Sequence, residues 1–140
     1  MSTPDTLLAA LGRHLNTELG LENGVCALFD QDREVAIIEM PPAGDVAVLH
    51  CKLPLRSTPD TYEHLLRLNF DTDALHGCWL ALAPRNDLRL CTHMALQGLS
   101  EAAFVHGVQG FIRQAREMPH LLKTVTPPKR SAMPGLARSL

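Results

Sequence analysis

The chain has 140 residues, a length typical of one domain that can bury its own hydrophobic core. Hydrophobic residues make up 46% of it and charged residues 20%, which excludes an intrinsically disordered protein. No apolar run is long enough to span a bilayer, and the first residues lack the basic start and apolar block of a secretory signal. The cysteines are far apart in apolar runs, so we expect reduced, buried thiols in a cytoplasmic protein: Cys26, Cys51, Cys78 and Cys91.

Charge is unevenly distributed along the chain. Of the 13 basic residues, Lys123, Lys129, Arg130 and Arg138 follow residue 118, whereas all 15 acidic residues precede it. Residues 1–118 therefore carry 9 basic and 15 acidic residues, a net charge of −6. Nucleic-acid binding needs a positive face, so this imbalance disfavours a nucleic-acid partner and favours a basic or neutral protein.

The first predicted element is a helix that opens at Thr3–Asp5. Threonine suits the cap, proline the first helical position, and aspartate the positive end of the helix dipole. Gly20 is a natural C-terminal end for this helix. One broad stripe of the helix is apolar: Leu7, Leu8, Leu11, Leu15 and Leu19.

Five strands are predicted from apolar runs bounded by turn residues. Short turns connect the runs at 24–30, 34–40 and 45–53, which favours an antiparallel meander. The runs at 77–83 and 87–96 are separated by a Pro-Arg-Asn-Asp turn and should form a hairpin.

A middle helix opens at Thr58–Asp60 with the same chemistry as the first. Its i, i+3, i+4, i+7 face contains Tyr62, Leu65, Leu66 and Asn69. The strand after it, at 77–82, has almost no polar position, and a strand of this kind is usually covered on both faces. A small domain seldom covers both faces itself, so we expect a second copy of the chain to cover this region.

A last helix should run from Ser100 to Pro119, and the basic, proline-containing tail at 119–140 is expected to be disordered. The order of elements is α-β-β-β-α-β-β-α. We therefore predict an α+β fold, a twisted five-stranded antiparallel sheet packed with three helices, in one domain at 1–118.

No motif for phosphate binding, nucleophilic catalysis or zinc-dependent hydrolysis is present. The histidines lie at unrelated spacings, so we expect no metal site and no cofactor. Cys91 and His93 share a strand face, which leaves open a small Cys/His enzyme. What remains is more apolar surface than the core needs, and it favours a dimer interface, a peptide groove, or both.

The order and spacing of several segments resemble the class I chaperones of type III secretion, the Tir or CesT-like chaperones. The segments that carry this resemblance are Leu7–Gly12, Leu19–Leu21, Asn23–Cys26, Leu65–Asn69, Gly77–Leu82, Leu88–Leu90 and Phe111–Ala115. The family's last helix often continues to a tryptophan, whereas Met118 and Pro119 are expected to stop it here.

The resemblance implies a homodimer that holds the N-terminal region of one or more secreted effectors extended and secretion-competent, without ATP. It implies effector-binding positions at Leu7, Leu11, Leu15, Val25, Ala27, Phe29, Val35 and Ile37. It implies dimer-interface positions at Tyr62, Leu65, Leu66, Trp79 and Ala81. One alternative keeps the fold but makes the protein a regulator that sequesters a cytosolic partner.

Overall fold

One antiparallel sheet and the helices packed on it make up the described part of the chain, which comprises residues 2–42, 44–56 and 58–124 of a computed structural model. The predicted α+β class is confirmed. The elements in chain order are α1 (Pro4–Leu15), β1 (Val25–Asp30), β2 (Arg33–Glu39), β3 (Val46–Lys52), α2 (Pro59–Phe70), α3 (Thr72–Leu75), β4 (Trp79–Leu82), β5 (Leu88–Ala95) and α4 (Glu101–Thr124).

The helix starts form as their sequences predict. The Thr3 hydroxyl accepts a hydrogen bond from the Thr6 backbone N–H at 3.2 Å, and the Thr6 hydroxyl accepts one from the Thr3 N–H at 2.8 Å. In α2, the Thr58 hydroxyl accepts from the Thr61 N–H at 3.2 Å. Each cap satisfies a donor that the first helical turn leaves without an intrahelical partner.

The strand order β1-β2-β3-β5-β4 joins the predicted meander to the predicted hairpin, because β5 pairs with β3. This order leaves β1 and β4 at the two edges of the sheet. A bulge between Leu28 and Phe29 shifts the register of β1 against β2, which places Phe29 opposite Glu34. A bulge of this kind twists the edge of a sheet.

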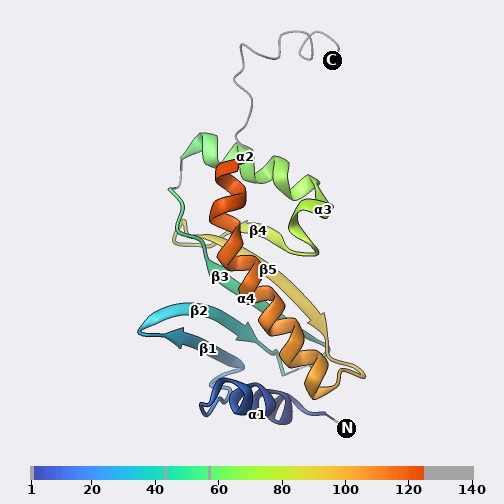
Figure 1. Ribbon diagram of the computed structural model, residues 1–140. Coiled ribbons are helices and arrows are strands. Elements are labelled where there is room, and N and C mark those ends of the chain that lie inside the picture. Colours follow the sequence, from blue (N-terminus) through green and yellow to red (C-terminus); the bar gives the residue numbers. More distant parts are fainter. Residues whose placement is uncertain (1, 43, 57, 125–140) are drawn as a thin grey trace, which may run out of the picture.

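The core lies between one face of the sheet and the helices. In β2 and β3, buried and half-buried residues alternate, so one face of the sheet packs inward. Figure 1 shows α4 running diagonally across the sheet, with α1 beside its first half. The largest fully buried side chains include Phe104 and Val108 of α4 and Leu7, Leu8 and Leu11 of α1.

The structure corrects several predicted boundaries. Helix α1 ends at Leu15 and not near Gly20, because Asn16 adopts a left-handed conformation and the Thr17 N–H turns back to the Gly12 carbonyl at 2.9 Å. The predicted loop after α2 contains the short helix α3. Strand β4 has four residues, of which only Leu80 is buried in the protomer.

The prediction that Pro119 ends the last helix is wrong. Helix α4 contains Pro119 and continues to Thr124. Proline removes one helical hydrogen bond, but Met118 before it is fully buried and Leu122 after it packs against the core. The burial of Met118 and Leu122 therefore outweighs the cost of the hydrogen bond lost at Pro119. The disordered tail predicted at 119–140 is therefore wrong for residues 119–124, which are helical, and its remainder, residues 125–140, lies outside the described residues.

Candidate functional site

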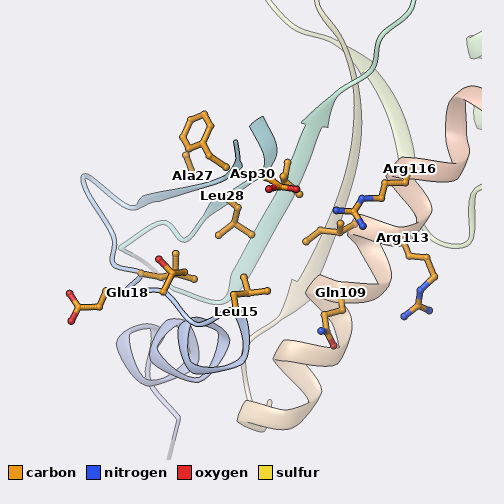
Figure 2. Close-up of a pocket in the computed structure, with 13 residues that line it drawn as sticks. Leu15, Glu18, Ala27, Leu28, Asp30, Gln109, Arg113 and Arg116 are labelled. Atoms are coloured by element: carbon orange, nitrogen blue, oxygen red, sulfur yellow. The ribbon is translucent and has the colours of Figure 1, made fainter. Parts of the chain in front are cut away.

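A groove of about 750 Å³ opens between the end of α1, the edge strand β1 and the middle of α4. Figure 2 shows its three walls and the side chains that line them. Segments distant in sequence meet here because α1 packs along α4. The lining residues are Leu15, Thr17, Glu18, Leu19, Ala27, Leu28, Phe29, Asp30, Val35, Gln109, Ile112, Arg113 and Arg116.

Four of the predicted effector-binding residues are brought together in this groove. They are Leu15, Ala27, Phe29 and Val35. Leu15 is 40% exposed and Phe29 is 64% exposed, values that leave apolar surface available to a partner.

The other four predicted effector-binding residues do not line the groove. Leu7 and Leu11 are 1% and 0% exposed, and they pack in the core of the protomer. They are therefore not open to a partner in this conformation of α1, and their part in effector binding stays a prediction. Val25 and Ile37 are half-buried in strands β1 and β2 and lie outside the groove.

The wall contributed by α4 was missed by the sequence reasoning. Gln109, Ile112, Arg113 and Arg116 recur at i, i+3, i+4 and i+7, so they form a second stripe beside the core stripe of the same helix. The sequence could have predicted this stripe from its spacing. Only the packing of α1 against α4 shows that the stripe faces a groove.

A second apolar surface lies where α2 packs beside β4. A pocket of about 150 Å³ is lined here by Tyr62, Leu65, Leu66, Asn69, Leu80, Ala81, Leu82 and Leu88. Leu65 is buried in the protomer and lies in the pocket wall, whereas Leu66 is 70% exposed and Leu82 is 49% exposed. Phe70, on the last turn of α2, is 91% exposed. We call Leu66, Phe70, Trp79 and Leu82 the α2–β4 patch.

The edge of the sheet beneath this patch is closed by a side chain. The Asn69 amide donates to the Leu80 carbonyl at 2.9 Å and accepts from the Leu80 N–H at 2.7 Å. These are backbone groups that an edge strand would otherwise offer to another strand. Contact with a second chain at Leu80 therefore depends on side chains.

The Cys91 and His93 pair lacks the features of an activated nucleophile. Burial raises the pKa of the Cys91 thiol, which disfavours the reactive thiolate. The His93 ring packs edge-on against Trp79, with 5.4 Å between ring centroids.

Within the described residues, no group of three or more His, Cys, Asp or Glu side chains could hold a metal ion. No helix in the described ranges has the length and apolarity needed to cross a membrane.

The fold is similar to that of chains in several solved protein complexes. A chain of the ExsC–ExsE complex matches with a TM-score of 0.68 and 12% identity, over 88% of this chain and 92% of that one. A chain of the HopA1–SchA chaperone–effector complex matches with a TM-score of 0.60 and 20% identity, over 80% and 91%. A chain from the complex of the Yersinia pestis type III secretion chaperone SycH with a fragment of YscM2 matches with a TM-score of 0.58 and 16% identity, over 81% and 97%.

At these identities, the structural similarity concerns the fold. No curated protein sequence matches the chain. The model of the Tir chaperone protein (CesT) family matches residues 6–118, which include every strand and most of α4. The resemblance carried by the sequence segments is thereby confirmed, and the chain belongs to the Tir chaperone protein (CesT) family.

Proposed function

We propose that this protein is a cytoplasmic, bacterial type III secretion chaperone that holds the N-terminal region of one or more effectors in an extended, secretion-competent form. Membership of the CesT family is the observation that carries the proposal. The HopA1–SchA structure is a chaperone–effector complex, and SycH is a type III secretion chaperone. The family and these neighbours are chaperones and not enzymes, so we assign no catalytic activity to the chain.

The groove beside β1 suits an extended client. Strand β1 pairs only with β2 within the sheet. The backbone N–H and carbonyl of Val25 bond to Glu22 at 3.0 and 2.9 Å, so the edge available to an added strand begins after Val25. A client strand gains main-chain hydrogen bonds at such an edge, while its alternate side chains enter neighbouring pockets. Leu15, Val35 and Ile112 supply the apolar contacts of those pockets. This mode of binding needs no nucleotide and no cofactor.

The α2–β4 patch is the proposed homodimer interface. Four large apolar side chains are exposed there on two adjacent elements: Leu66, Phe70, Trp79 and Leu82. Burial of one such side chain contributes roughly 1.5–3 kcal/mol. Tyr62 and Ala81 line the pocket beside them. A second copy would therefore cover four of the five predicted interface positions, Tyr62, Leu66, Trp79 and Ala81, and the fifth, Leu65, lies buried beneath them.

Co-purification with secreted proteins of the source bacterium tests the proposed function. The N-terminal segments of candidate effectors, encoded beside the chaperone, are co-expressed with the tagged full-length protein. A stable complex is expected, and Leu15→Asp should abolish it because a carboxylate would enter the apolar groove. Ala9→Asp, on the exposed side of the same helix and outside the groove lining, should leave it intact.

Export of the captured protein separates the chaperone from the regulator. A client that leaves the cell through the secretion apparatus supports the proposal. A partner that always stays in the cytosol would instead identify a regulator, and the failure to capture any secreted protein would contradict the chaperone function.

A further inference from the structure

We infer that the groove selects clients with an acidic side chain next to an apolar anchor, and that Arg116 and Arg113 of α4 are the residues that select them. This inference rests on the proposed function and concerns the chemistry of its client. Both arginines line the groove, one helical turn apart. Figure 2 shows Arg116 extending from α4 toward the β1 side, whereas Arg113 extends along the other side of α4 in this view.

Neither arginine has an ion-pair or hydrogen-bond partner among the described residues. Arg13, Arg67 and Arg89 pair with Glu101, Glu63 and Glu34 at 3.1, 2.7 and 2.7 Å. Arg33, Arg56 and Arg85 also form no ion pair with a described residue, but they lie outside the groove lining. Residues 1–118 contain 15 acidic side chains and only 9 basic ones, so carboxylates are abundant in this domain. Two unpaired arginines on the wall of a groove are therefore positioned to bind a carboxylate from another molecule.

The acidic residues of the groove lie on its opposite side. Asp30 ends β1 and Glu18 follows α1, and neither forms an ion pair with Arg113 or Arg116 in the described structure. The groove is therefore polarised, with cations on α4 and carboxylates on the rim formed by α1 and β1. A client carboxylate is attracted toward α4 and repelled from the opposite rim, which fixes its side of the groove.

Arginine and carboxylate match in geometry as well as charge. The guanidinium can donate two parallel hydrogen bonds to one carboxylate. The apolar side chains Leu15, Val35 and Ile112 beside the arginines reduce the local dielectric and strengthen this contact. Ile112 and Arg116 are separated by about 6 Å along the helix axis. Alternate side chains of an extended peptide are about 6.6 Å apart, so where the peptide passes along α4, an anchor on Ile112 places a carboxylate two residues away near Arg116.

A displayed library of short random peptides tests the inference with the full-length protein. The library is panned on the wild type, on Arg113→Gln/Arg116→Gln, and on Arg56→Gln/Arg85→Gln, whose arginines lie outside the groove lining. Peptides that the Leu15→Asp variant fails to retain are counted as groove binders. The groove binders of the wild type and of the control should be enriched in Asp and Glu, and those of the Arg113/Arg116 variant should not.

A double-mutant cycle on one selected peptide measures the contact itself. Replacement of its acid by the amide should weaken binding to the wild type by about tenfold and should leave binding to Arg113→Gln/Arg116→Gln unchanged. Two results would overturn the inference: wild-type groove binders that are not enriched in Asp and Glu, or an amide peptide that binds the wild type as tightly as the acidic peptide does. The capture of a secreted client would still stand in that case, so failure of the charge selection is distinguishable from failure of the proposed function.

Discussion

The side chain of Asn69 on α2 forms two hydrogen bonds with the backbone of Leu80 on β4, one to its N–H at 2.7 Å and one to its carbonyl at 2.9 Å. The amide thus occupies the position of a neighbouring strand. It ties α2 to the edge of the sheet and orients the exposed residues on both sides, Leu66 on the helix and Leu82 on the strand. The geometry of the α2–β4 patch therefore depends on a polar residue at its centre.

Replacement of Asn69 by leucine should destabilise the protein. The substitution preserves the approximate volume but leaves the N–H and carbonyl of Leu80 without their partner, at a cost of about 1–3 kcal/mol. Urea unfolding at fixed protein concentration measures the loss. Gln97→Leu, an exposed amide in the loop after β5, is the matched control and should unfold like the wild type. Equal midpoints for both variants would show that the Asn69 bonds contribute nothing.

Self-association should depend on the exposed leucines of the α2–β4 patch. In a symmetric dimer, the double variant Leu66→Asp/Leu82→Asp places four carboxylates in the interface. It also removes the four leucines that the dimer would bury there. The dissociation constant of the dimer should rise by at least about a thousandfold. Light scattering at micromolar concentration should give a dimer mass for the wild type and a monomer mass for the variant.

Ala102→Asp, exposed at the start of α4 and remote from the patch, controls for added charge and should stay dimeric. Circular dichroism should show that all three proteins are folded. A wild type that is monomeric at these concentrations would contradict the proposed interface.

Local sequence signals predicted the elements because each signal is short-range. The strand ends differ from the predicted ranges by at most two residues. Turn residues such as Gln31 and Asp32 adopt positive φ where the chain reverses, and they mark these ends in the sequence. The end of α1 and the passage of α4 through Pro119 were not predictable in this way. Tertiary contacts decide both: the turn of Thr17 back to Gly12, and the burial of Met118.

The groove was only half predictable for the same reason. A leucine stripe indicates which face of α1 is apolar, but it does not separate the residues under α4 from those at the open end of the helix. The structure separates them, because Leu11 is fully buried and Leu15 is 40% exposed. The arginines of α4 became groove residues only once α1 and β1 were placed beside that helix.

The different exposure of Leu11 and Leu15 predicts different effects for two similar substitutions in α1. Leu11→Ala leaves a cavity in the core and should reduce the free energy of unfolding by about 2–5 kcal/mol. Leu15→Ala removes a side chain that is already partly in water, and the reduction should stay below about 1 kcal/mol. Urea unfolding gives both values, and client affinity should fall for Leu15→Ala while the protein remains folded. Similar stability losses at the two positions would contradict the assignment of Leu15 to the groove.

The buried thiols predict how stability responds to alkaline pH. Burial raises the pKa of Cys51 from 9.0 to about 11. As pH rises, the thiol of Cys51 therefore loses its proton first in the unfolded chain, which stabilises the unfolded state. The free energy of unfolding should fall between about pH 9 and pH 11. The urea midpoint of the wild type should fall through this window more steeply than that of Cys51→Ala. Parallel slopes for the two proteins would show that Cys51 titrates alike in both states.

The last turns of α4 should add stability although the family match ends at residue 118. A chain that stops after Met118 loses the contacts of Leu122 with the core and brings the helix end next to a fully buried side chain. Its free energy of unfolding should be lower by about 1 kcal/mol than that of a chain that stops after Thr124. Urea midpoints of the two truncated proteins test this difference, and the full-length chain measures what residues 125–140 add. Identical midpoints for the two truncations would mean that the domain ends at Met118 and that the helix beyond Pro119 contributes no stability.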